Sequence, residues 1–243
     1  MKIIKIEFRK LIDSKLIWAA LALVFIMCLA TTMMVKDEQV QASSTSYFVY
    51  AAMYSVQMMF QFIIPVIMIL LISYIIGNEY GNGTIKTFMI SKVSKKQFFI
   101  SKLLFIIMCV FILIIFSILS IMLLCFIKNG SLDASADDIL KLVKTFLILG
   151  AAMLPIILIV AVASIFMGDF QKSLLFGIVF LVLLLSANSL FDNSIYSPTH
   201  LLNCSEQIFL SKVNNKEFLV LSGYIAALFT AGVVIFDHKD IWE

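Results

Sequence analysis

Six stretches of the chain run for nineteen residues or more without Asp, Glu, Lys or Arg, and they organise the whole sequence. A helix rises about 1.5 Å per residue, so about 20 apolar residues cross a hydrocarbon core about 30 Å thick. The pattern therefore predicts an all-α integral membrane protein with six transmembrane helices. The charge-free runs predict these helices at about 16–35, 50–76, 103–127, 145–167, 173–190 and 218–236.

Composition supports this interpretation. Apolar residues make up 62% of the 243 residues and the mean hydropathy is +1.07, well above a soluble domain. The first run lacks a small-residue cleavage site, so we interpret it as a retained helix rather than a signal peptide. Six crossings leave little chain for a second domain, and residues 1–243 are expected to form a single transmembrane domain.

The distribution of positive charge predicts the orientation. With six crossings both ends of the chain lie on the same side of the membrane. If that side is the cytoplasm, twelve of the 18 Lys and Arg residues are cytoplasmic, and they concentrate around the first helix. The positive-inside rule therefore predicts both termini inside, outer loops at about 36–46, 128–144 and 191–217, and inner loops at about 77–102 and 168–172.

The segment 1–15 precedes the first membrane helix and is amphipathic. On a helix, its apolar residues, among them Phe8, fall within about 100° of arc. Lys2, Lys5 and Arg9 lie on the opposite side. Such sorting predicts an interfacial helix in the headgroup plane, with its cations toward anionic lipid. The alternative is a positive flank that only orients the first helix.

The loop 78–102 is the most informative segment outside the membrane. Glycines punctuate its start, and residues 84–91 can form two helical turns with Ile85, Phe88 and Met89 on one face. Ser94 and Gln97 form a capping-box pattern, so a new helix is expected to start there and continue into the third membrane helix. Apolar side chains in a basic frame indicate either a partner surface or a loop packed on lipid headgroups.

The residues of this loop carry a resemblance to a known family. Glu79-Tyr-x-x-Gly83-Thr84-x-Lys86, followed by a Ser-Lys-x-x-Ser stretch and Lys102, is similar to membrane subunits of ABC-2-type transporters. Six membrane helices and an amphipathic N-terminal elbow helix are further features of that family. Within the family, a small subunit of this kind resembles permeases of bacitracin or lantibiotic self-protection and of the phenol-soluble modulin exporter.

The resemblance implies a permease that exports amphipathic, antimicrobial or toxin peptides across a bacterial cytoplasmic membrane. It implies two copies of a separate ABC ATPase and a second permease subunit, identical or homologous, as partners. ATP and Mg would then be bound by the ATPase. The residues expected to couple this chain to the ATPase are Glu79, Gly83, Thr84, Ile85, Lys86, Phe88, Met89, Lys95 and Lys96.

Missing motifs narrow the function classes. The sequence contains no Gly-x-x-x-x-Gly-Lys-Ser/Thr phosphate loop, and its two histidines and four cysteines show no metal-ligand spacing, so no cofactor or metal is expected in this chain. The predicted membrane helices carry no ionisable residue away from their ends, which disfavours an intramembrane enzyme and proton coupling. The alternatives that remain are an ATP-independent sensor or scaffold and an exporter of ions or small drugs.

A polar stripe marks the second membrane helix. One face of this helix carries Tyr47, Tyr50, Tyr54, Gln57 and Gln61, and Met68 continues the line. One interpretation is the lining of a translocation path for amphipathic peptides. The other is that the glutamines hold helices together and the tyrosines form an interfacial belt.

Three further features concern helix packing. Pro155 is expected to kink the fourth membrane helix. Gly223, Ala227 and Ala231, spaced by four in the sixth, predict close approach to another helix. By analogy with the family, the segment after the fifth helix dips back into the membrane, although the sequence alone also allows a plain loop.

Overall fold

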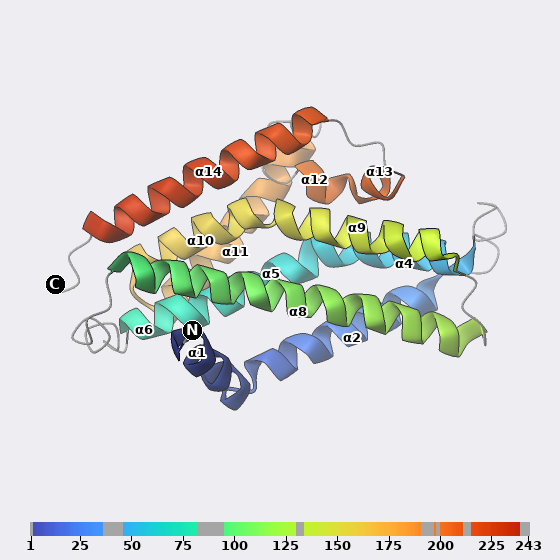
Figure 1. The fold of residues 1–243 in the computed structure, drawn as a ribbon, viewed down its shortest axis with the longest axis horizontal. Coiled ribbons are helices and arrows are strands. Elements are labelled where there is room, and N and C mark those ends of the chain that lie inside the picture. Colours follow the sequence, from blue (N-terminus) through green and yellow to red (C-terminus); the bar gives the residue numbers. More distant parts are fainter. Residues whose placement is uncertain are drawn as a thin grey trace.

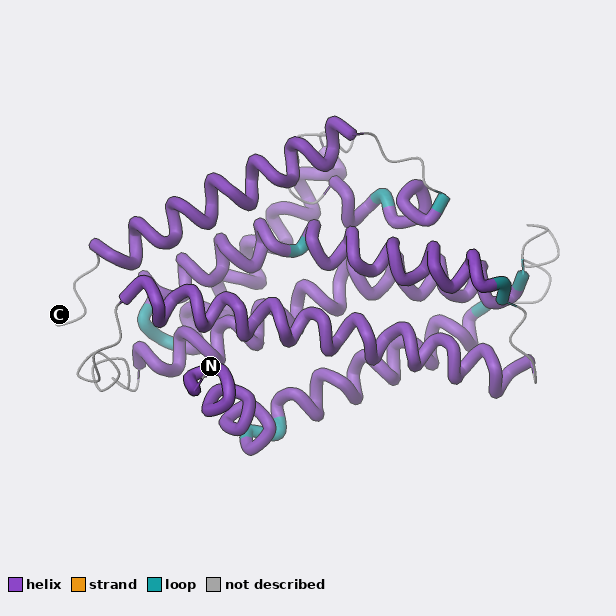
Figure 2. The backbone as a smooth tube through the Cα atoms, in the orientation of Figure 1, coloured by secondary structure: helices purple, strands orange, loops and turns teal. Residues whose placement is uncertain are grey.

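The computed structural model describes residues 2–35, 46–81, 95–129, 134–190, 197, 200–210 and 215–238. Helices make up nearly all of these residues, and no strand occurs among them (Figure 2). Six helical segments are long and apolar enough to cross a membrane. The prediction of an all-α membrane protein with six crossings is therefore confirmed.

Eleven helical elements of the described residues form the six segments. α1 (Lys2–Asp13) precedes the first crossing, α2 (Leu16–Met34). The second crossing is composite and runs through α4 (Tyr47–Met58), η1 (Met59–Ile63), α5 (Ile64–Ile72), η2 (Ser73–Gly77) and α6 (Asn78–Gly81). The others are α8 (Lys95–Asn129), α9 (Ala136–Ala152) with α10 (Leu154–Met167), α11 (Phe170–Leu190) and α14 (Asn215–His238).

Both ends of the described chain lie at one end of the bundle. Figure 1 shows α1, α6, the start of α8 and the end of α14 together at this end, which we call the inner end after the charge-based prediction. The end of α2, the start of α4 and the end of α8 lie at the opposite, outer end. The second crossing is the most buried of the six and occupies the centre of the bundle.

Helices extend beyond the predicted membrane segments at several ends. Part of the expected outer loop 128–144 is helical, because α9 begins at Ala136. A capping box fixes this start, since the Ser135 hydroxyl accepts a hydrogen bond from the Asp138 N–H and the Asp138 carboxylate accepts one from the Ser135 N–H. Charge-free runs locate the part of a helix inside lipid, whereas caps decide where the helix begins.

The fourth crossing breaks where Pro155 predicts it. α9 ends at Ala152, Met153 forms a turn, and α10 starts with Pro155 in its first turn, where its missing N–H costs no helical hydrogen bond. At the other end of α10, Gly168 adopts a left-handed conformation (φ 61°) and closes the helix. The short connection that follows leads directly into α11.

The described part of the segment after α11, residues 200–210, folds against the bundle and is no plain loop. It forms two short helices, α12 (His200–Asn203) and α13 (Ser205–Phe209), which contact α9 and α4. α12 also contacts η1, the middle of the second crossing. The buried side chains of this segment include Leu201, Leu202, Ile208 and Phe209. The segment therefore reaches into the depth of the bundle.

The small residues of α14 do not pack as predicted. Gly223, Ala227 and Ala231 are exposed, and a methyl group added at Gly223 would meet nothing within 4 Å. α14 instead contacts α10 and α8, and Gly232 is the point of close approach, 3.2 Å from Val162 for an added Cβ. The spacing of small residues by four identified a smooth face of α14. The packing of the larger side chains of this helix determines which face points into the bundle.

Candidate functional site

The elbow helix α1 lies across the inner end and packs against α2 and α8. Phe8 meets Phe105 edge to face at 6.5 Å, and Leu11 is fully buried, while Arg9 is exposed. Lys2 and Lys5 lie within α1, but their side chains are outside the described structure. The predicted helix therefore forms, and its apolar face anchors it to the membrane helices.

Four charged side chains meet where α1, the second crossing and α8 converge. The Lys102 ammonium lies 2.7 Å from Glu7 and 2.7 Å from Glu79. The other oxygen of Glu79 accepts a hydrogen bond of 2.8 Å from Lys10. Lys102 is 1% exposed and the side chain of Glu79 is 2% exposed. We call these residues (Glu7, Lys10, Glu79 and Lys102) the ion cluster.

The charges of the ion cluster balance, two positive against two negative. Burial acts to lower the pKa of Lys10, but its hydrogen bond to Glu79 and the negative charges of Glu79 and Glu7 outweigh burial, so the pKa of Lys10 is raised. Lys102 also lies 5.2 Å from the centre of the Phe98 ring. Buried charges that are paired in this way specify one geometry, because any displacement leaves a charge without its partner.

Glu79 was predicted as a coupling residue, and the structure places it inside the protein. Its carboxylate is directed at Lys10 and Lys102 and is not available to an external partner. Lys96 is exposed near the start of α8, and Lys95 begins that helix with its side chain outside the described structure. Gly83, Thr84, Ile85, Lys86, Phe88 and Met89 lie outside the described residues.

Three members of the ion cluster were not selected as site residues by the sequence analysis: Glu7, Lys10 and Lys102. Two signals could have found Lys102 and Glu7. Lys102 stands at the edge of a long apolar run, where a cation requires a partner. Glu7 borders the apolar arc of α1, on a segment otherwise rich in lysine.

The second crossing also approaches the α10–α11 connection closely at the inner end. A Cβ added at Gly77 would lie 3.1 Å from the Asp169 carbonyl oxygen, so a larger residue would push this connection away by a few tenths of an ångström. Nearby, the buried Ser173 hydroxyl donates to Ser73 at 3.0 Å and is also hydrogen-bonded to Ser164. The inner end of the second crossing is therefore connected to α1, α8, α10 and α11 together.

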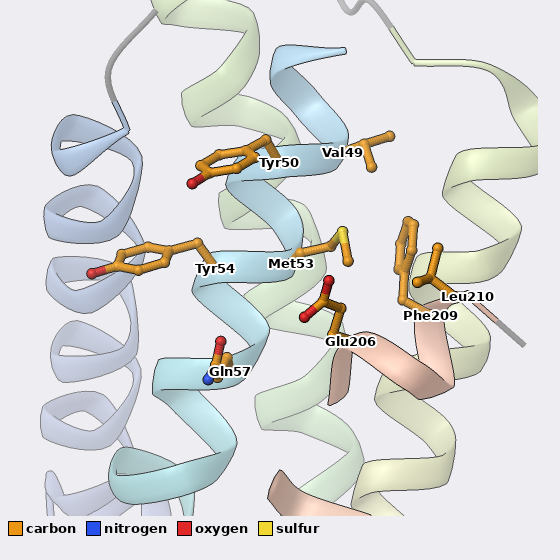
Figure 3. A pocket seen from close by; sticks show the side chains of 8 residues that line it. All are labelled: Val49, Tyr50, Met53, Tyr54, Gln57, Glu206, Phe209 and Leu210. Carbon is orange, nitrogen blue, oxygen red and sulfur yellow. The ribbon is translucent and has the colours of Figure 1, made fainter. Parts of the chain in front are cut away.

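A groove of about 420 Å³ opens beside α4 in the outer half of the bundle, and α13 forms its opposite wall. Three residues of the predicted stripe line it: Tyr50, Tyr54 and Gln57. Tyr47 and Gln61 are not among the lining residues, and Met68 is buried in the bundle core. Figure 3 shows Tyr50 and Tyr54 extending from α4 on the side away from Phe209, with Glu206 between α4 and Phe209.

Sequence analysis missed Glu206, Phe209 and Leu210 as groove residues because they lie far along the chain from α4. Their approach depends on the packing of α13, which no local pattern encodes. The signal that was present is the run Gln207-Ile-Phe-Leu, an apolar stretch in a predicted outer loop.

Hydrogen bonds to neutral oxygens hold the outer end together. The Tyr47 hydroxyl donates to the Thr32 carbonyl at 2.7 Å, and the hydroxyls of Thr31 and Ser55 are 2.8 Å apart. Lys128 donates to the Val35 carbonyl at 2.9 Å and lies 4.6 Å from the centre of the Tyr47 ring. A cation placed on the final carbonyls of α2 satisfies groups that have no partner within that helix.

Comparison with known proteins gives one family. No curated protein matches the chain. A family model described as ABC-2 family transporter protein matches residues 3–188, which include α1, the ion cluster and five of the six crossings. No group of three metal-ligating side chains occurs in the described part of the chain. The chain belongs to the ABC-2 transporter family and is the membrane-spanning permease component of an ABC transporter.

Proposed function

We propose that this permease exports amphipathic peptides, of the antimicrobial or toxin type, from the cytoplasmic membrane of a bacterium. Two copies of a separate ABC ATPase would supply the energy, and a second permease subunit would complete the pathway. Residues 82–96, which include Lys95 and Lys96, would contact the ATPase. The observation that carries the proposal is the outer groove, whose lining combines apolar and polar chemistry on one wall.

The lining suits a ligand with two kinds of surface. Tyr50, Tyr54 and Phe209 offer ring faces, and Met53 adds an adaptable thioether side chain. Gln57 and Glu206 offer hydrogen-bonding groups in the same groove. Its volume of about 420 Å³ falls within the usual range of ligand sites, about 300–1,000 Å³. An amphipathic peptide could place apolar side chains on the rings and polar groups on the amide and carboxylate.

The ion cluster gives a physical route for coupling. Glu79 lies two residues before the end of α6 and holds α1 and α8 through Lys10 and Lys102. A push on residues 82–94 would therefore move the second crossing, the elbow helix and the start of α8 as one unit. The groove lies on α4, at the other end of that same crossing.

Purification of the tagged chain in mild detergent tests the energy source. The proposal requires a co-purifying protein that hydrolyses ATP. Reversal of charge at Lys95 and Lys96, or Phe88→Asp, should separate ATP hydrolysis from transport while the complex stays folded. Lys172→Glu changes an exposed lysine of the α11 first turn and serves as the matched control. Full transport by the loop variants, or purification without any ATPase, would overturn the coupling proposal.

A second measurement tests the cargo. Tyr54→Ala and Gln57→Ala should reduce the protection that the transporter gives cells against an amphipathic peptide, with basal ATP hydrolysis unchanged. Phe62→Ala is a control, because Phe62 is an exposed aromatic residue of η1 outside the groove lining. Equal protection by the groove variants and the wild type would contradict a role for the groove in peptide export.

A further inference from the structure

An open depression of about 580 Å³ lies between the elbow helix and the inner end of the second crossing. It is lined by Arg9, Lys10, Asp13, Ser14 and Tyr74. Four of these residues come from the end of α1 and the turn after it, and Tyr74 comes from η2. The depression is distinct from the outer groove, which lies at the opposite end of the bundle.

The surroundings of the depression place it at the level of lipid headgroups. α1 is amphipathic, and its apolar Ile12 is exposed beside Asp13. Trp18, at the start of α2, is 60% exposed, and tryptophan on an outward face is typical of the membrane–water boundary. The short turn at Ser14 and Lys15 joins the two helices. The lining residues therefore lie where the phosphates of the inner leaflet would be.

The cations of the depression have unused hydrogen-bonding capacity. Within the described part of the chain, Arg9 has no carboxylate within ion-pair distance. Lys10 donates to Glu79, but an ammonium has three N–H groups and this side chain is 44% exposed. A guanidinium beside an ammonium favours a phosphate, because both groups donate charge-assisted hydrogen bonds to its oxygens.

We propose that this depression binds the phosphodiester of an anionic phospholipid, held by Arg9 and Lys10. Asp13 would repel a bare phosphate but accepts hydrogen bonds from hydroxyl groups. The combination therefore fits a headgroup that carries hydroxyls on an anionic phosphate, such as phosphatidylglycerol. A free phosphate ion shares part of this chemistry, so the experiment must separate the two sources.

Lys10 belongs to both the depression and the ion cluster. A lipid phosphate beside Lys10 adds negative charge next to an ammonium whose other partner is Glu79. A lipid held there would favour the position in which α1 is docked on α8 and the ion cluster is closed. Binding of this lipid does not depend on the cargo or on an ATPase, so it can be tested separately from the proposed export.

The test is lipid binding by the purified protein in detergent, measured by native mass spectrometry. The probes are phosphatidylglycerol, phosphatidic acid, phosphatidylcholine and inorganic phosphate. Arg9→Gln is the main variant, because Arg9 is exposed and outside the ion cluster. Lys172→Gln removes an exposed lysine outside the depression and is the matched control.

We expect the wild-type protein to retain phosphatidylglycerol in preference to phosphatidylcholine. Arg9→Gln should weaken phosphatidylglycerol binding about tenfold, which corresponds to the loss of one charge-assisted hydrogen bond. Lys172→Gln should bind this lipid like the wild type. Asp13→Asn should reduce the preference for phosphatidylglycerol over phosphatidic acid. Equal binding of phosphatidylcholine, or no effect of Arg9→Gln, would overturn the proposal. Inorganic phosphate that displaces the lipid at equal concentration would assign the depression to a soluble anion instead.

Discussion

The two ends of the second crossing are held in opposite ways. At the inner end, Glu79 is fixed between two ammonium groups and is shielded from solvent. At the outer end, Tyr47 and Ser55 make hydrogen bonds to neutral oxygens of Thr32 and Thr31. Hydroxyl and carbonyl groups exchange partners at small cost, whereas a buried charge that loses its partner is strongly destabilised.

This difference suggests a division of labour along one helix. The inner end has a single favourable geometry, so a displacement of α6 would move α1 and α8 with it. The outer end borders an open groove and can rearrange. Two π-helical segments interrupt this crossing, η2 at the inner end directly before Asn78 and Glu79, and η1 in the middle beside α12. Such segments rotate the following residues relative to an α-helix and are frequent at functional sites.

The largest expected effect comes from removing the central cation of the ion cluster. Lys102→Met leaves Glu7 and Glu79 buried with only Lys10 nearby, which should cost about 3–5 kcal/mol of stability. The measurement is the melting temperature of the detergent-purified protein, monitored by fluorescence-detection size-exclusion chromatography. Lys96→Met, at an exposed position of the same helix, is the control and should remain near wild type.

A rescue variant sharpens this prediction. If unpaired charge is the cause, adding Glu7→Gln and Glu79→Gln to Lys102→Met should restore much of the lost stability, because no buried carboxylate then lacks a partner. A triple variant less stable than Lys102→Met would show that packing around the lysine chain, and not charge, holds the inner end.

In the middle of the second crossing, stability should depend on side-chain volume and not on charge. A Cβ at Gly177 of α11 would lie 2.3 Å from Cγ2 of Ile69, which is fully buried. Gly177→Ala should therefore destabilise the protein by about 1–3 kcal/mol through overpacking. Gly223→Ala is the matched control, since an added Cβ there meets nothing within 4 Å. Similar melting temperatures for the two variants would contradict the close approach of α5 and α11.

The outer end should tolerate a lost hydrogen bond better. Tyr47→Phe removes the hydroxyl that donates to the Thr32 carbonyl, and a loss of about 1 kcal/mol is expected. Tyr54→Phe is the control, because it removes the phenolic hydroxyl of a tyrosine that lines the groove. A loss as large as that of Lys102→Met would remove the distinction between the two ends.

The crossings could be predicted from sequence because lipid imposes a length and excludes charge. That argument located all six, and Pro155 located the break between α9 and α10. Helix ends were less predictable, because a capping box such as Ser135 with Asp138 extends a helix beyond the apolar run. The exposed small-residue face of α14 shows that spacing alone does not identify the partner helix.

The ion cluster and the groove could be predicted only in part. Tyr50, Tyr54 and Gln57 share one helix, so a helical projection groups them. Glu7, Glu79 and Lys102 come from three separate helices, and Glu206 reaches the groove through the packing of α13. Such contacts depend on how helices pack, which the periodicity of one segment does not encode.

The smallest expected effect concerns pH at the exposed edge of the ion cluster. The pKa of Lys10 is raised in the folded protein, so its contribution to stability is complete below the unfolded value of about 10.4. This contribution is lost as pH rises through the higher folded pKa. Because Lys10 is 44% exposed, solvent screening limits it to a few tenths of a kcal/mol.

Comparison of wild type with Lys10→Met measures this contribution directly. The wild type should be slightly more stable at pH 8, and the difference should shrink as the pH rises above about 10.4. Lys172→Met corrects for removing one positive charge from the inner end. A stability difference that grows with pH would mean that Lys10 stabilises the fold through packing of its hydrocarbon chain. Charge pairing would then contribute less to the stability of the inner end than we propose from its comparison with the outer end.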